Sequence, residues 1–134
     1  MLCMIVSCST LRNTNGENLP GWIKGRFIDD YGIEYTVNDT VFIQHPSARY
    51  YILSWNEAGQ YLLVKNDESN PTEKGLYSRI DYLPFTGMEP YTWGFCLTVY
   101  NAKDTVLARM APSADRSAPR KGCNGYPFSR MKRK

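Results

Sequence analysis

The sequence predicts an all-β fold, an antiparallel meander of about eight strands that closes into an up-and-down barrel. Its 134 residues are the usual size of a single domain. Ten Tyr, five Phe and three Trp make 18 aromatic residues, or 13% of the chain, and aromatic side chains favour strands. Turn signals recur roughly every ten residues and no long helical stripe is present, which is typical of a barrel or sandwich. A β-sandwich is the alternative.

Glycine, asparagine and proline bound the first four expected strands. Gly32 can adopt a positive φ in a hairpin loop, and Asn38 and Asp39 favour the next turn. Pro46 ends the third strand, because proline has no backbone N–H for the sheet. The first four strands are expected at 21–28, 33–37, 40–44 and 49–55.

Loops of different length separate the last four expected strands. Residues 56–59 form a four-residue hairpin loop. The oxygen-rich stretch 66–71 lacks the regular spacing of a calcium loop, so we expect a solvated loop there. Residues 84–90 form a third loop and 101–104 a fourth, and the remaining strands are expected at 60–65, 75–83, 91–100 and 105–110.

Charge divides the chain into an acidic body and a basic tail. Residues 109–134 contain eight basic residues and one acid, a net charge of +7, whereas residues 1–108 contain eight basic and twelve acidic residues, a net charge of −4. Such a tail can fold back on the body or meet an anionic partner such as lipid head groups or nucleic acid.

The amino end resembles the end of a bacterial lipoprotein signal peptide. Ile5, Val6 and Ser7 precede Cys8, as an aliphatic and a small residue precede the lipidated cysteine of a lipobox. The resemblance implies a lipid anchor on Cys8 and a place in the bacterial cell envelope, in the outer membrane or periplasm. The apolar run of seven residues lacks the basic residues of a secretory signal, which a start codon placed too late would explain. The alternative is an apolar strand or a disordered tail at residues 1–8.

Two cysteines remain if Cys8 carries lipid and the preceding residues are removed. Cys96 and Cys123 are then an even pair that an exporting cell would oxidise. Period-two alternation over 91–100 places Cys96 on the face away from the core, and Cys123 lies in a turn-rich segment. A disulfide would strap the basic tail across the outside of the sheet, and two reduced thiols are the alternative. The domain layout is then a flexible tether at 9–20 and a single barrel domain at 21–134, which includes the strap 109–134.

The sequence contains no arrangement of residues typical of an enzyme. Phosphate-binding, dinucleotide-binding, metalloprotease and serine-hydrolase motifs are absent. The single histidine, His45, precedes a proline at a strand end, where a surface loop histidine is expected. The adjacent carboxylates Asp29 and Asp30 are explained by turn formation. We therefore expect no catalytic residues, no metal and no cofactor.

Aromatic residues on two strands are candidates for ligand contact. If both faces point inward they form an apolar lining with polar handles, and a filled core is the alternative. The candidates on one strand are Tyr51, Leu53 and Trp55, and those on the other are Tyr91, Trp93 and Phe95.

The overall scheme is similar to the lipocalin and calycin group. Gly21-Trp22 at the start of the first strand resembles the opening Gly-x-Trp of that group, with the spacing off by one. The resemblance implies a barrel with an apolar pocket, and so a lipid-anchored envelope protein that binds a small apolar or amphipathic ligand. The alternative is a surface or periplasmic module that contacts a protein or polysaccharide. A third reading, from the aromatic and basic residues 125–134, is a cytosolic nucleic-acid binder, but no nucleic acid is expected for an exported protein.

Overall fold

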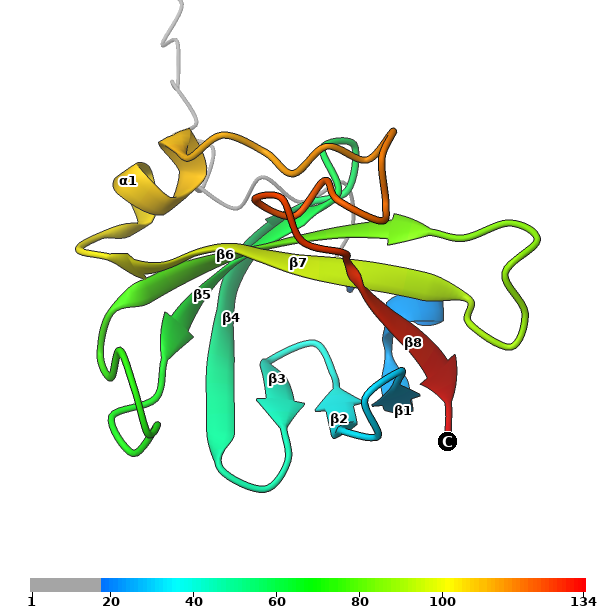
Figure 1. Ribbon diagram of the computed structural model, residues 1–134. Coiled ribbons are helices and arrows are strands. Elements are labelled where there is room, and N and C mark those ends of the chain that lie inside the picture. Colours follow the sequence, from blue (N-terminus) through cyan, green and yellow to red (C-terminus); the bar gives the residue numbers. More distant parts are fainter. Residues whose placement is uncertain (1–17) are drawn as a thin grey trace, which may run out of the picture.

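Eight antiparallel strands form a closed barrel (Figure 1). The structure is a computed structural model that describes residues 18–134, so Cys8 and the predicted lipobox lie outside the described residues. Each strand pairs with the next along the chain, and β8 pairs with β1 to close the sheet. The predicted all-β meander and barrel closure are confirmed. The strands are β1 (Gly25–Asp29), β2 (Glu34–Val37), β3 (Val41–Gln44), β4 (Ala48–Asn56), β5 (Tyr61–Asn66), β6 (Tyr77–Pro84), β7 (Trp93–Ala102) and β8 (Ser129–Arg133).

Aromatic rings from opposite walls meet inside the barrel. The ring centroid of Phe95 on β7 lies 5.4 Å from that of Tyr35 on β2 and 5.1 Å from that of Phe42 on β3. Trp93, also on β7, lies 5.2 Å from Phe27 on β1. All these contacts are edge-to-face, the arrangement that aromatic quadrupoles favour. The interior of the barrel is therefore a packed aromatic core.

The folded domain begins earlier than the predicted boundary at residue 21. Leu19 is 3% exposed and belongs to the core, and its backbone N–H donates to Asp39 Oδ1 at 2.9 Å. Residues Gly21–Ile23, predicted to start the first strand, form a short 3-10 helix instead. Its Ile23 is buried in the core, and β1 starts two residues later.

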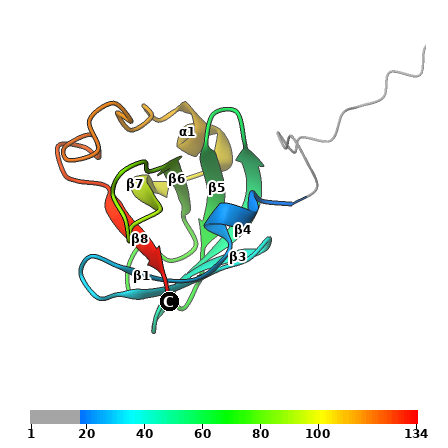
Figure 2. The ribbon, with the colours of Figure 1, turned by 90° about the vertical axis from the view of Figure 1, so that its right-hand side faces the viewer.

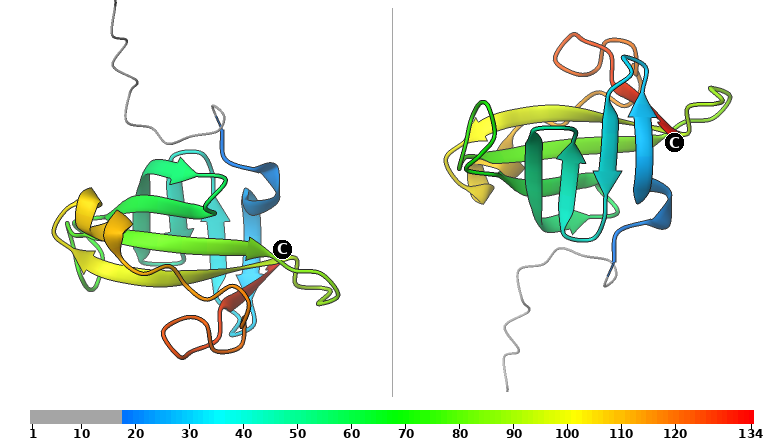
Figure 3. Two further views of the ribbon diagram at one scale, coloured as in Figure 1. Left: turned by 90° about the horizontal axis from the view of Figure 1, so that it is seen from above. Right: turned by 90° about the horizontal axis from the view of Figure 1, so that it is seen from below.

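The predicted eighth strand at 105–110 is wrong. These residues form the helix α1 (Thr105–Met110), which packs on the outside of the sheet against β5, β6 and β7 (Figure 3). Asp104 caps the helix, since its side chain accepts a hydrogen bond from Leu107 N at 2.8 Å. The true eighth strand, β8, lies at the end of the chain. The basic tail is therefore part of the barrel wall as well as a strap across it.

The segment 111–128 lies on the outside of the barrel between α1 and β8 (Figure 2). A disulfide joins Cys123 in this segment to Cys96 on β7. The predicted pairing is confirmed, and so is the outward face of Cys96, which packs with Phe128 in a second apolar cluster separate from the barrel core. The disulfide fastens the segment to the sheet.

A buried carboxylate fastens the same segment at a second point. Asp81 on β6 has no exposed surface, and its Oδ1 accepts from Arg116 Nη2 at 3.0 Å and from Arg79 Nη2 at 3.1 Å. Its Oδ2 accepts from Thr98 Oγ1 at 2.8 Å and from Ala114 N at 3.1 Å. Two guanidinium groups and two further donors thus satisfy the buried charge, as burial requires. The basic tail is held to the acidic body here by a specific ion pair.

Among the residues that the structure describes, no helix has the length and apolar character needed to cross a membrane.

Candidate functional site

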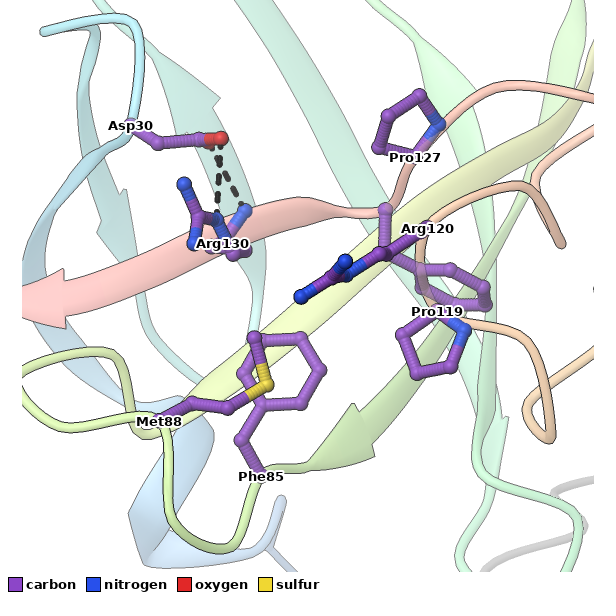
Figure 4. Close-up of a pocket in the computed structure, with 8 residues that line it drawn as sticks. Asp30, Phe85, Met88, Pro119, Arg120, Pro127 and Arg130 are labelled. Atoms are coloured by element: carbon purple, nitrogen blue, oxygen red, sulfur yellow. Dashed lines mark hydrogen bonds and ion pairs between the residues drawn. The ribbon is translucent and has the colours of Figure 1, made fainter.

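A pocket opens on the outer surface, between the β6–β7 loop and the end of the 111–128 segment (Figure 4). Its volume is about 320 Å³, near the lower end of the range for small-molecule sites, roughly 300–1,000 Å³. Five of its eight lining residues are apolar. The lining residues are Asp30, Phe85, Met88, Pro119, Arg120, Pro127, Phe128 and Arg130.

Phe85 and Phe128 make the apolar floor. Phe85 directly follows β6, and its backbone N–H donates to Thr92 O at 2.9 Å across the β6–β7 loop. Phe128 directly precedes β8, is 1% exposed, and its N–H donates to Pro119 O at 2.8 Å. Both rings pack in the outer cluster that contains the disulfide. The floor is therefore held by strand ends and a covalent bond rather than by a free loop.

Arg130 on β8 forms one charged edge of the pocket. Its Nε donates to Asp30 Oδ2 at 3.2 Å, and its backbone N–H donates to Asp30 Oδ1 at 3.1 Å. The guanidinium carbon also lies 4.6 Å from the centroid of the Tyr91 ring, close enough for a cation–π contact. Because it has a carboxylate partner and an aromatic partner, Arg130 has a fixed position in the site.

Arg120 provides a second guanidinium with a different environment. Its side chain extends from the 111–128 segment across the pocket (Figure 4). Arg120 is exposed, and its guanidinium makes no hydrogen bond or ion pair to any residue in the range 18–134. The pocket thus combines an apolar floor with a positive charge that has no partner within the described part of the chain.

A second hollow adjoins the pocket. Its volume is about 460 Å³, and Met88, Pro119 and Arg120 line both spaces. Ala118 and Lys121 complete its walls. Arg120 therefore borders both hollows.

The six residues predicted to line a ligand site do not come together. Trp55 is 4% exposed inside the barrel, whereas Tyr51 and Leu53 are 42% and 41% exposed on its outer surface. The shared face expected for these three is wrong. The register of β4 against β5 shifts between Ile52 and Ser54, so that Leu53 is the extra residue of a β-bulge. A bulge reverses the alternation on one side of itself.

The second predicted group is also divided. Trp93 and Phe95 face inward as expected, at 1% and 8% exposure, and are part of the packed core. Tyr91 precedes β7 and is half-buried, and its ring centroid lies 4.6 Å from the guanidinium carbon of Arg130 and 5.8 Å from Lys132 Nζ. None of the six predicted residues lines the pocket, and the ring of Tyr91 contacts a residue that does, namely Arg130.

Three buried polar atoms inside the barrel have no partner among the described residues. They are the indole Nε1 atoms of Trp55 and Trp93 and the hydroxyl of Tyr82. Burial raises the pKa of Tyr82 to about 12, because an apolar site disfavours the phenolate. The Trp22 ring, which is 37% exposed, lies 5.5 Å from the Tyr82 ring and 6.4 Å from the Trp93 ring.

The three polar residues singled out in the sequence, Asp29, Asp30 and His45, have hydrogen-bond partners within the domain. Asp29 forms the predicted turn, where its Oδ1 accepts from Tyr31 N and Ile33 N, both at 2.9 Å. Asp30 instead pairs with Arg130, one hundred residues away. His45 is exposed, and its Nε2 lies 2.8 Å from Thr36 Oγ1. No cluster of three or more His, Cys, Asp or Glu suited to a metal ion occurs in residues 18–134.

Sequence reasoning missed the residues that line the pocket. Two signals were available. The loop 84–90 contains Phe85 and Met88 beside prolines, and Pro127-Phe128 places apolar residues within a basic tail. The predicted disulfide already brought this tail to the sheet.

Comparison of the chain with protein-family models, with curated proteins and with solved structures finds no significant match.

Proposed function

We propose that this protein is a non-enzymatic, lipid-anchored binding protein of the bacterial cell envelope, and that it takes a small amphipathic molecule in the external pocket. The observation that carries the proposal is an open pocket whose floor is apolar and whose rim is charged. An amphipathic guest needs both surfaces side by side. Pockets of this kind, with a few placed polar groups, are the usual sites for small ligands.

The location of the site differs from that of a lipocalin-like barrel, in which the ligand would lie inside. Here Trp93, Phe95, Phe42 and Phe27 occupy the interior in mutual contact. Displacing them would remove edge-to-face contacts and apolar burial of about 1.5–3 kcal/mol for each large side chain. A guest on the outer pocket displaces no core residue, so the external site is the less costly one.

The disulfide supports the extracytoplasmic part of the proposal. Cys96 and Cys123 are joined, and disulfides persist mainly in exported proteins. The anchor is tested by mass spectrometry of the full-length protein extracted from bacterial membranes. We expect a diacylglyceryl adduct on Cys8, and a Cys8→Ser variant that leaves the membrane fraction. An unmodified Cys8 in the extracted protein would overturn the anchored part of the proposal.

Ligand binding is tested with decyl maltoside, a nonionic amphiphile, below the concentration at which it forms micelles. Met88→Asp places a charge on the apolar lining of the pocket, and Met110→Asp makes the same change at a 72% exposed residue of α1. In calorimetric titrations we expect binding by the wild type and by Met110→Asp, and a loss of about tenfold or more in Met88→Asp, since desolvating a carboxylate on an apolar surface is costly. Equal binding by both variants would place the guest elsewhere, and no binding by the wild type would refute the proposal.

The other sequence-based interpretation, a module that contacts a protein or polysaccharide, stays a prediction.

A further inference from the structure

We propose that the pocket selects amphiphiles with an anionic head group, a carboxylate or a phosphate, and that Arg120 is the residue that binds this head group. The inference rests on the proposed function and adds the charge of the ligand to it. The occupant we infer is a free single-chain amphiphile, whose chain lies on Phe85, Met88 and Phe128 while its head group meets the guanidinium of Arg120.

Arg120 differs from the other arginines between residues 116 and 134. Arg116 binds Asp81 and the carbonyl oxygens of Tyr82 and Gly59. Arg130 binds Asp30, and Arg133 donates to the carbonyl oxygens of Lys24 and Gly21. These three arginines hold the chain to the barrel. Arg120 has no such partner in the described part of the chain, so its five N–H donors are free for a ligand.

A guanidinium beside an apolar floor suits an anionic amphiphile for two reasons. Its planar fork can donate two parallel hydrogen bonds to a carboxylate or phosphate, which a point charge cannot match. Low-polarity surroundings also strengthen such a contact relative to open water. Phe85, Met88 and Pro119 supply these surroundings around Arg120.

Charges near Arg120 determine where the head group can lie. Asp30 is the only carboxylate that lines the pocket among residues 18–134, and it is bound to Arg130. Arg130 offers an anion little net attraction, because Asp30 already neutralises its charge. Lys121 lines the adjoining hollow next to Arg120. The head group is therefore expected on the Arg120 and Lys121 side, and the chain on the floor.

The experiment compares three twelve- or ten-carbon probes, each below its micelle-forming concentration. Dodecanoate and dodecyl phosphate carry anionic heads, and decyl maltoside is the neutral reference. Calorimetric titration is expected to show that the wild type binds the anionic probes at least about tenfold more tightly than the maltoside, since a hydrogen bond to a charged group commonly contributes that much. Rising salt should reduce the difference, because the charged contact is partly exposed.

Arg120→Gln should abolish the preference for anionic probes, so that dodecanoate and dodecyl phosphate bind no more tightly than the maltoside does. Arg109→Gln is the matched control, since it removes the same charge from an exposed side chain on α1 and should retain the preference. Asp30→Asn, which frees Arg130, should tighten dodecanoate binding severalfold. If Arg109→Gln loses the preference as fully as Arg120→Gln does, net charge rather than this site explains it, and the inference fails.

The outcomes separate this inference from the proposed function. Equal affinity for dodecanoate and maltoside, both lost in Met88→Asp, would leave the binding function standing and refute the role of Arg120. No binding of any probe would refute both. Vesicles of phosphatidylglycerol test the alternative source of the same head group. Flotation of the protein without its lipid anchor with such vesicles, in the absence of dodecanoate binding, would identify a bilayer surface and overturn the free amphiphile.

Discussion

The ring of Phe85 lies against Gly94, in space that a side chain at Gly94 would occupy. A Cβ atom on Gly94 would lie 2.5 Å from Phe85 Cζ and 2.9 Å from the carbonyl oxygen of Ser129. Gly94 lies on β7, between Phe85 at the end of β6 and Ser129 on β8. The position of Phe85 in the floor of the pocket therefore depends on a glycine in β7. A missing side chain in a strand commonly marks such a close approach.

Gly94→Ala should therefore displace Phe85 and weaken amphiphile binding. We expect a loss of stability of about 1–3 kcal/mol from overpacking, and a lower affinity for dodecanoate measured on the folded variant. Gly21→Ala is the control, because its added Cβ has no atom within 4 Å. Unchanged affinity in Gly94→Ala would show that Phe85 is not part of the binding surface.

Removal of the disulfide should destabilise the domain. Cys96 and Cys123 are 27 residues apart, and closing a loop of this length contributes roughly 3–4 kcal/mol in the chain-entropy account. Urea unfolding of the Cys96→Ala/Cys123→Ala variant should show a loss of this order, and reduced wild type should behave similarly. A variant as stable as the oxidised wild type would mean that Asp81 and β8 alone hold the 111–128 segment.

Neutralising Asp81 should lower the free energy of unfolding more than most single substitutions do. In Asp81→Asn the guanidiniums of Arg79 and Arg116, whose side chains are 7% and 25% exposed, lose their counter-charge. Breaking a buried ion pair in this way typically costs about 3–5 kcal/mol. Glu34→Gln, which breaks the exposed pair with Lys134, should have a much smaller effect on the urea midpoint. Similar midpoints for the two variants would contradict the anchoring role of Asp81.

Tyr82→Phe should change the alkaline limb of the stability curve. Burial raises the pKa of Tyr82 to about 12, whereas a tyrosine in the unfolded chain has a pKa of about 10. Between these pH values the unfolded state loses the proton and the folded state keeps it. The free energy of unfolding is therefore constant with respect to this group below about pH 10 and falls as pH rises toward 12. The variant should show a shallower fall over this window.

At neutral pH the same variant should be no less stable than the wild type. The hydroxyl of Tyr82 has no partner among the described residues, and an unpartnered buried hydroxyl is destabilising. Tyr126→Phe, at a 74% exposed residue, is the control for both measurements. A marked loss of stability in Tyr82→Phe at pH 7 would show that the hydroxyl makes a hydrogen bond.

Local patterns predicted most of the turns, the barrel and the outward face of Cys96, whereas the pairing of Cys96 with Cys123 was predicted by counting the cysteines that remain if Cys8 carries lipid. The alternation around Cys96 placed it on the outer face, because the inward neighbours Phe95 and Leu97 belong to the same core. Thr105 and Val106 are typical strand residues and predict a strand at 105–110, but Asp104 is a helix N-cap residue whose side chain accepts from Leu107 N and starts the helix there.

Other features depend on contacts that no local pattern contains. The strand β8 has one buried apolar residue, Met131, among polar neighbours, and it is a strand because β1 and β7 pair with it. The bulge at Leu53 arises from the register against β5. The pocket joins Asp30 to segments about fifty to one hundred residues further along the chain, so only the closed barrel brings its parts together.

The position of the ligand is tested most directly by NMR titration of the protein with dodecanoate. The Met88 methyl group and the Arg120 side chain report on the outer pocket, and the indole N–H groups of Trp55 and Trp93 report on the barrel interior. We predict saturable shifts at Met88 and Arg120, with both indole signals unmoved. Shifts at the two indoles with Met88 and Arg120 unaffected would place the guest inside the barrel and contradict the external site.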